Sequence, residues 1–329
     1  MNEDAALAPA DFPDRRDGLV YLMPDKLALA VDVALATGRP LLLRGEPGTG
    51  KSSLAAYVAR ERGWRYYEHV VTSQTQARDL LWTFDSVRRL ADAQAGTAGS
   101  RSLDPADYIQ PGVLWWALAP DSAARHGRAG TESMPSHEIN RDRSADHAVV
   151  LIDEIDKADP DLPNGLLVPL SAGSFLVTET GTVVGKTAAG KRADASAGGP
   201  RHLVIITTNE ERELPEAFLR RCVVAWLDPP GKDELIDIAR AHLTVYEGGY
   251  TERDDALALA LAKEITTARA QARQHGIRPA STAEYLDALR ACRALGIDVG
   301  SDEWTLLREF VFLKPRQPGG LDGEQSLAW

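Results

Sequence analysis

A glycine-rich loop that ends in lysine and serine is the strongest chemical signal in the sequence. Residues 45–52 read GEPGTGKS and satisfy the pattern G-x-x-x-x-G-K-[ST] in full. Glycines let the backbone bend so that successive N–H groups point at phosphate oxygens, and the helix that follows adds its positive end. Lys51 supplies a charge to the outer phosphates, and the Ser52 hydroxyl is suited to Mg²⁺. The residues expected to bind a nucleoside triphosphate are Gly45, Glu46, Pro47, Gly48, Thr49, Gly50, Lys51, Ser52 and Ser53.

Two carboxylates end an apolar run about a hundred residues further on. Residues 149–152 read VVLI, and Asp153 and Glu154 follow at once. In a parallel sheet ligands bind beyond the carboxyl ends of the strands, so we expect Asp153 to hold Mg²⁺ and Glu154 to polarise a water for attack on the γ-phosphate. The alternative is a solvated strand end without chemistry. Asp156 is interpreted as a structural or surface acid.

The elements that must position these residues alternate along the first part of the chain. Short apolar runs predict buried strands, and apolar residues at helical spacing predict helices. The predicted strands are 41–43, 65–70, 149–152, 203–208 and 223–227. The predicted helices are 25–37, 51–62, 76–94, 109–118 and 162–170, the last interrupted by its own proline and glycine. Residues 173–184 alternate apolar and polar side chains and predict a β-hairpin. Polar stretches at 121–147 and 186–199 predict exposed loops.

The sequence changes character after Asp228-Pro229-Pro230-Gly231. Helical patterns then occupy 232–247, 253–275, 282–295 and 301–312, and no strand pattern occurs. The fold class expected is α/β, with a three-layer αβα P-loop NTPase core built on a parallel sheet and a small all-helical lid domain after it. The expected division is a flexible tail at 1–17, the nucleotide-binding core at 18–229, the helical lid at 230–315 and a tail at 316–329.

Composition limits the class of partner. The formal net charge is −11, which gives no support to a global attraction to nucleic acid or to an acidic membrane. Cys222 and Cys292 form no CxxC pair, so neither a zinc site nor a disulfide framework is indicated. No apolar run is long enough for a membrane helix, and the acidic N-terminus does not resemble a signal peptide. A cytoplasmic protein is expected.

The two motifs together resemble the Walker A and Walker B motifs of AAA+ ATPases. The wider pattern is similar to the MoxR and dynein-related branch, in LLLRGEPGTGKSSLAAYVA at 41–59, in VVLIDEIDKADPDLPNGLLVPL at 149–170 and in the hairpin that follows. The resemblance covers residues 25–295 and is strongest from 41 to 222. It implies that the triphosphate is ATP. It also implies that the hairpin at 173–184 corresponds to an insertion that this branch carries within its second helix.

The resemblance implies three further site residues. Asn209, which follows the strand LVIITT, matches the sensor 1 position, with Thr208 as the neighbouring alternative. Arg221 matches the arginine finger that reaches into the next subunit's site, and Arg220 is the neighbouring candidate. The alternative for either arginine, and the one expected for Arg220, is that it caps the helix C-terminus or binds solvent. Arg278, just before a lid helix, is the sensor 2 candidate, although the family's usual spacing around this arginine is not reproduced.

The activity that the resemblance implies is ATP hydrolysis with Mg²⁺ in a ring of subunits, expected to be a hexamer. Such a ring would remodel a protein partner, and MoxR-like proteins act with von Willebrand factor A domain proteins. Two rival hypotheses remain open at this point. One is a nucleic-acid machine of the clamp-loader or restriction type, against which the acidic charge weighs. The other is a nucleotide-gated scaffold with little turnover, against which the intact Asp153-Glu154 pair weighs.

Overall fold

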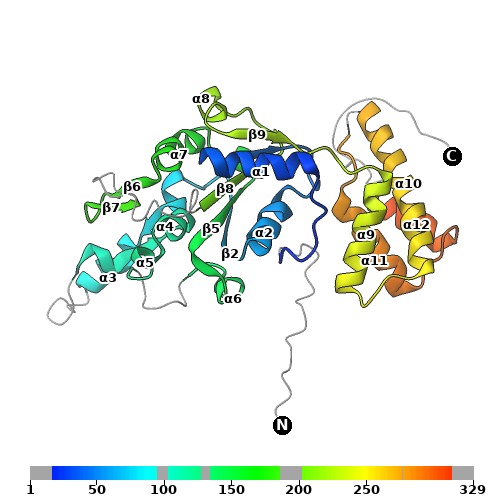
Figure 1. The fold of residues 1–329 in the computed structure, drawn as a ribbon, viewed down its shortest axis with the longest axis horizontal. Helices are drawn as coiled ribbons and strands as arrows, with labels where there is room; N and C mark the ends of the chain where they lie inside the picture. The colour runs from blue at the N-terminus through cyan, green and yellow to red at the C-terminus, as the bar shows by residue number, and fades with distance from the viewer. Residues whose placement is uncertain (1–16, 95–102, 127–133, 186–201, 276, 313–329) are drawn as a thin grey trace, which may run out of the picture. The chain divides into compact units, whose positions relative to one another are not determined.

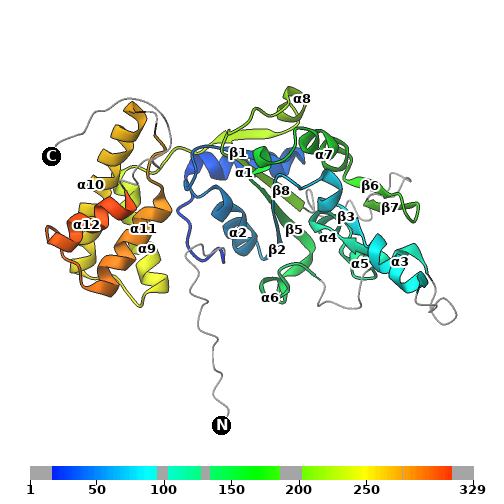
Figure 2. The same ribbon diagram turned by 180° about the vertical axis from the view of Figure 1, so that it is seen from behind.

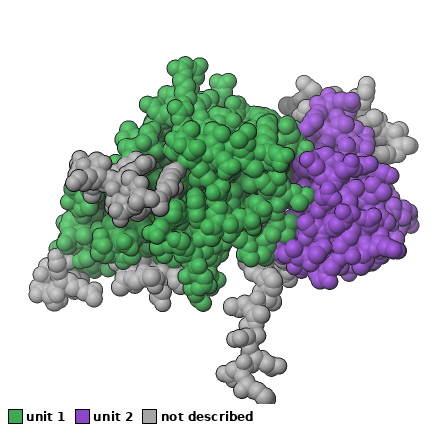
Figure 3. Space-filling model, viewed as in Figure 1, with its two compact units in different colours: residues 1–229 green, residues 230–329 purple. Residues whose placement is uncertain are grey.

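The structure, a computed structural model, describes residues 17–94, 103–126, 134–185, 202–275 and 277–312 (Figure 1). The chain divides between Pro229 and Pro230 into two compact units, which Figure 3 colours separately. The first unit is built on a parallel sheet and the second is helical in its described part. The predicted tails and the stretch at 186–199 lie outside the described residues, apart from Asp17.

Five parallel strands form the sheet of the first unit. Their order is β2-β5-β8-β1-β9, and every neighbouring pair runs parallel. The strands are β1 (Leu41–Arg44), β2 (Trp64–Val70), β5 (Ser144–Asp153), β8 (His202–Thr208) and β9 (Val223–Trp226). The register sets Asp153 opposite Val70 and Arg44 opposite Thr208. The carboxyl ends of the strands therefore share one edge, where ligands bind in folds of this type.

Helices cover both faces of this sheet (Figures 1 and 2). Helices α1 (Asp25–Thr37) and α2 (Lys51–Glu61) pack on one face, and α4 (Val113–Leu118) and α7 (Asp161–Ala172) pack on the other. Successive residues of a strand point to opposite faces, so Leu41 and Leu43 enter one core while Leu42 enters the other. Burial on both faces explains the continuous apolar runs and confirms the predicted αβα fold.

Tertiary pairing overrides the helical pattern predicted at 76–94 and at the start of 109–118. The first stretch is a 3₁₀ helix, η1 (Ala77–Leu80), then strand β3 (Trp82–Phe84) and helix α3 (Ser86–Gln94). The second follows η3 (Pro105–Tyr108) and begins with strand β4 (Ile109–Pro111), which pairs antiparallel with β3. Gly112 then separates β4 from α4, and a Cβ there would lie 2.5 Å from the backbone of Leu80.

Two other predicted segments also differ from the structure. The stretch 121–147 is not simply an exposed loop, because it includes the end of α5 (Pro120–Ala123), helix α6 (His137–Asn140) and the start of β5; residues 127–133 are not described. Asn140 is buried, and its side-chain amide exchanges hydrogen bonds of 2.7 and 2.8 Å with the backbone of Tyr66. Helix α7 is not interrupted, since it continues past Gly165 and Pro169.

The predicted hairpin forms, but at a different place in the fold from the one the resemblance implies. It consists of β6 (Ser174–Val177) and β7 (Thr182–Gly185) and lies in the chain between α7 and β8. The segment inserted between β2 and β5 contains β3, α3 and β4, and it does not contain the hairpin. The ring of Trp82 in β3 stacks on Phe175 in β6, with ring centroids 5.6 Å apart. The β3–α3–β4 segment and the β6–β7 hairpin therefore pack together.

The second unit contains four helices in its described part, with one core between them. They are α9 (Lys232–Tyr246), α10 (Glu252–Gln274), α11 (Thr282–Leu295) and α12 (Asp302–Val311). Side chains of Thr251, Ser281 and Ser301 accept hydrogen bonds from the first turns of α10, α11 and α12. Such caps satisfy backbone N–H groups that a helix cannot pair itself, which explains where these helices begin.

Trp115 of α4 provides a test of the core between the sheet and helices α4 and α7. The side chain is fully buried, lies edge-on to Phe175 and donates from Nε1 to Ser122. Trp115→Ala should lower the free energy of unfolding by about 3–5 kcal/mol through the cavity it leaves. Urea unfolding followed by circular dichroism measures this. The control Val87→Ala, at an exposed position of α3, should change stability by less than about 0.5 kcal/mol.

Candidate functional site

The glycine-rich loop lies between β1 and α2, at the carboxyl edge of the sheet. Lys51 is the first residue of α2 and is buried, and its Nζ donates to the backbone carbonyls of Gly45 and Glu46, both at 2.8 Å. Burial lowers the pKa of Lys51 below its usual range, and the nearby carboxylates of Asp153, Asp156 and Glu154 oppose this shift. The ammonium is therefore held at the loop, within reach of a phosphate that the loop amides would cradle.

Two glycines of the loop meet constraints that a side chain would break. Gly45 has a φ of 151°, and a Cβ there would lie 2.4 Å from the carbonyl oxygen of Leu227. Gly50, which precedes α2, has a φ of 91° and faces the ring of Tyr21. Both conformations favour glycine, so the motif's glycines are explained by backbone geometry.

Asp153 joins three elements through one carboxylate oxygen. Its Oδ1 accepts hydrogen bonds from the Ser52 hydroxyl on α2 at 2.7 Å and from the Thr207 hydroxyl on β8 at 2.6 Å. Asp153 is the last residue of β5 and is 3% exposed. The two side chains predicted as Mg²⁺ ligands, Ser52 and Asp153, are therefore brought together directly beside Lys51.

Glu154 is placed beside them in an unusual backbone conformation. Its φ is 60° and its ψ is 50°, a left-handed conformation that costs a residue with a side chain on the order of 1–2 kcal/mol. The Glu154 amide donates to Thr207 Oγ1 at 2.8 Å, which holds the turn. Its carboxylate accepts from Asn209 Nδ2 on Oε1 at 3.2 Å and from Lys157 Nζ on Oε2 at 2.5 Å. The structure thus brings the side-chain amide of Asn209 to the carboxylate of Glu154.

Asp156 is the residue whose part in the site the sequence left most open. It is 3% exposed, and its Oδ2 accepts from the amides of Asn209 and Glu211 at 3.2 and 2.9 Å. Its Oδ1 is buried without a hydrogen-bond partner. Of the two interpretations given to Asp156, the structural one fits, because the carboxylate fixes the segment that carries Asn209. The spacing of three acids within four residues was the available signal.

Arg44 and Tyr21 also border the loop, and no motif singles them out. Arg44, the last residue of β1, donates from Nε to Glu210 Oε1 at 2.7 Å, so it ties the start of the loop to the residue after Asn209. Tyr21 precedes α1, and burial raises its pKa well above the usual range. The segment around Tyr21 also crosses α2, since a Cβ on Gly18 would meet the carbonyl of Ala56 at 2.4 Å.

Of the predicted arginines, Arg220 and Arg221 belong to the first unit and Arg278 belongs to the second. Arg220 and Arg221 follow α8 (Glu216–Leu219), and both side chains bond back to this helix. Arg220 pairs with Glu216 at 2.7 Å, and Arg221 donates to the carbonyl of Ala217 at 3.1 Å. Arg278 lies in the second unit between α10 and α11 and is exposed, whereas Arg269 of α10 is buried and donates to the carbonyl of Ala280.

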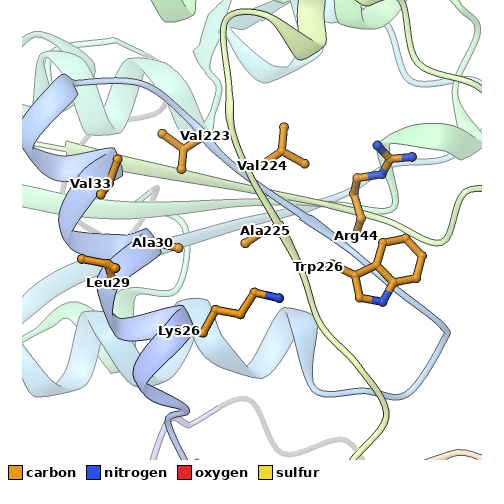
Figure 4. Close-up of a pocket in the computed structure, with 9 residues that line it drawn as sticks. All are labelled: Lys26, Leu29, Ala30, Val33, Arg44, Val223, Val224, Ala225 and Trp226. Atoms are coloured by element: carbon orange, nitrogen blue, oxygen red, sulfur yellow. The ribbon is translucent and has the colours of Figure 1, made fainter.

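A groove of about 480 Å³ lies elsewhere, between α1 and the outer strand β9 (Figure 4). Residues of α1, β9 and the end of β1 line it: Lys26, Leu29, Ala30, Val33, Arg44, Val223, Val224, Ala225 and Trp226. The residues predicted to bind nucleotide or metal all lie in the described part of the chain, and none of them lines the groove. The groove is therefore distinct from the loop site.

Asp156→Ala should destabilise the protein, because the amides of Asn209 and Glu211 lose their buried acceptor. The expected loss is about 1–3 kcal/mol in the free energy of unfolding, measured by urea titration. Glu213→Ala removes an exposed acid from the same connection and should cost less than about 0.5 kcal/mol. Equal stability of the two variants would show that Asp156 does not hold the segment.

Comparison with known proteins gives one family. The sequence profile of the AAA domain, dynein-related subfamily, matches residues 40–222, which is more than half of the chain. No curated protein matches the sequence. Among solved structures, the RuvB Holliday junction branch migration motor of Thermotoga maritima is 15% identical, with a TM-score of 0.41, over 87% of this chain and 67% of that one.

NtrX of Brucella abortus is 13% identical, with a TM-score of 0.47, over 93% of this chain and 58% of that one. Both TM-scores are below 0.5, and neither likeness bears on ligands or partners. Within the part of the chain that is described, no helix is both long and apolar enough to cross a membrane. The match over residues 40–222 carries the conclusion that this chain belongs to the dynein-related subfamily of AAA ATPases.

Proposed function

We propose that this protein binds ATP with Mg²⁺ and hydrolyses it at the loop between β1 and α2. The observation that carries the proposal is the contact of 2.7 Å between the Ser52 hydroxyl and Asp153 Oδ1, one residue from the buried ammonium of Lys51. A phosphate-binding loop, a hydroxyl and a carboxylate in this order are what a metal-bound triphosphate requires. Family membership supports ATP as the nucleotide.

The residues fit a Mg²⁺ ion that depends on its nucleotide. Ser52 and Asp153 offer oxygen ligands, which Mg²⁺ prefers. Among the described residues, no group of three or more His, Cys, Asp or Glu side chains is placed to hold a metal. The ion would therefore complete its coordination with phosphate oxygens and water, as Mg²⁺ does in nucleotide sites. When bound, it neutralises charge on the phosphates.

The protein's own groups divide the remaining work. Lys51 would exchange the carbonyls of Gly45 and Glu46 for phosphate oxygens. Glu154 orients a water, which attacks the γ-phosphorus and gives a proton to the carboxylate as the bond to the bridging oxygen of ADP breaks. Asn209, bonded to Glu154 Oε1, positions the same water. Gly45–Ser53 and Arg278 are the proposed nucleotide contacts.

Glu154→Gln should separate binding from turnover. The amide keeps the shape of the side chain but cannot accept the proton, so we expect ATP hydrolysis to fall about 10²–10⁴-fold while ATP still raises the melting temperature. Lys51→Ala should abolish both turnover and the thermal shift. Lys263→Ala, an exposed lysine of the second unit, serves as the matched control and should behave as wild type. Turnover that survives Glu154→Gln would remove Glu154 from the mechanism.

The proposal extends to a ring of subunits, expected to be a hexamer of MoxR-like type, located in the cytoplasm. Proteins of this family generally assemble as rings, and Arg221 is proposed to reach the ATP of the next subunit. The Arg221 side chain is exposed, and within the described part of the chain its guanidinium donates to one backbone carbonyl, that of Ala217. Such a ring would remodel a partner protein, and a von Willebrand factor A domain protein is the proposed partner.

The neighbouring arginines provide a matched pair for testing this assembly. Arg221→Ala should leave ATP binding intact but lower turnover on the order of 10³-fold, as loss of an arginine finger does. Arg220→Ala removes only the exposed pair with Glu216 and should retain turnover. Mixing Arg221→Ala subunits with Glu154→Gln subunits should restore activity at the mixed interfaces. Unchanged turnover in Arg221→Ala would contradict an intersubunit site. A molecular mass of the wild-type particle that stays the same when ATP is added would also contradict it, because ring assembly should raise this mass.

A further inference from the structure

The carboxylate of Glu154 is held from both sides. Asn209 Nδ2 donates to Oε1 at 3.2 Å, and Lys157 Nζ donates to Oε2 at 2.5 Å. Lys157 is three residues after Glu154, in the 3₁₀ turn η5 (Ile155–Lys157), so the turn itself delivers the ammonium to the carboxylate. The predicted roles account for Asn209 but give none to Lys157.

We propose that Lys157 is a positioning residue that restrains Glu154 and slows ATP turnover until it moves away; the inference rests on the proposed function. Glu154 must present an oxygen to the attacking water. In the observed arrangement one carboxylate oxygen of Glu154 accepts from the Asn209 amide and the other accepts from the Lys157 ammonium.

Lys157 has a second partner available. Its side chain is 42% exposed, so it can move without disturbing the core. Glu211 and Asp156 are close enough to act electrostatically on Lys157, and Glu211 is exposed. Asp156 is 3% exposed and its unpartnered Oδ1 is buried, whereas Glu211 is exposed as Lys157 is, so Glu211 is the alternative acceptor that the ammonium reaches from solvent. The ammonium would therefore alternate between Glu154 and Glu211.

Exposure limits how strong this restraint is. The Glu154 side chain is 29% exposed, and ion pairs at such positions are weak and screened by salt. A pair of this kind favours the held state by a factor of no more than about five. The restraint therefore adjusts the basal rate and does not block turnover, which defines the size of effect to look for.

Lys157→Gln is the direct test, with steady-state ATP hydrolysis at low salt as the measurement. The restraint predicts that kcat rises about two- to fivefold while KM for ATP and the melting temperature stay unchanged. Lys157→Arg keeps the charge and should keep the wild-type rate, and Lys263→Gln controls for loss of a lysine elsewhere. A kcat that is unchanged or lower in Lys157→Gln would overturn the proposal.

Glu211→Gln tests the second position of the lysine. Without that acceptor Lys157 stays on Glu154, so kcat should fall below wild type, and the double variant with Lys157→Gln should return to the raised rate. A raised kcat in Glu211→Gln alone would refute the alternation.

Failure of the underlying function has a different appearance. If wild type and Lys157→Gln both bind ATP and neither hydrolyses it, the ATPase proposal fails and takes the restraint with it. If both hydrolyse ATP at the same rate, only the restraint fails. In a Glu154→Gln background, Lys157→Gln should give no gain, because the group it acts through is absent.

Discussion

The hydrogen bonds accepted by Asp153 Oδ1 hold the site together. One oxygen at the end of β5 bonds the Ser52 hydroxyl of α2 and the Thr207 hydroxyl of β8, so three segments distant in sequence meet at one atom. A buried carboxylate requires such partners, since leaving it unsatisfied would cost several kcal/mol. The position of Glu154, one residue later, and of Asn209, two residues after Thr207, follows from this junction.

Each of the other charged side chains at the site has a hydrogen-bonding or ionic partner within the described part of the chain. Lys51 is bonded to the loop carbonyls, Glu154 to Asn209 and Lys157, Asp156 to two backbone amides, and Arg44 to Glu210. Under the proposed function, Lys51 and Glu154 are the groups that would exchange partners when a nucleotide binds, whereas Asp156 holds the segment that carries Asn209. Lys157, three residues after Glu154, would then adjust the rate of a step that depends on the Glu154 carboxylate itself.

The sequence predicts those parts that depend on local patterns. The loop at 45–52 and the acids after the strand at 149–152 are contiguous motifs, and apolar runs with few polar breaks identify strands buried on both faces. The αβα fold and the family follow from them. The individual roles of the site residues remain predictions, which the geometry supports by bringing Ser52, Asp153, Glu154 and Asn209 together.

Features that depend on distant contacts escape such patterns. Trp82-Thr83-Phe84 forms a strand only because residues 109–111 pair with it across an intervening helix. Asn140 is an ordinary polar residue in the sequence, yet it is buried against the backbone of Tyr66. The contacts of Asp156 and Tyr21 likewise depend on how separate segments meet. In these cases the turns and the strand pairing determine the local structure, and the intrinsic propensities of the residues do not predict it.

The most direct test of the central claim is where a divalent metal binds when ATP is present. Mn²⁺ can replace Mg²⁺, and electron–nuclear double resonance detects the phosphorus nuclei of phosphates whose oxygens coordinate the ion. A nucleotide site built on Asp153 predicts one protein-bound Mn²⁺ per chain with phosphate coupling, and loss of this protein-bound species in both Ser52→Ala and Asp153→Asn. ATP binding without a phosphate-coupled metal, or an unchanged spectrum in those variants, would contradict a nucleotide site built on Asp153.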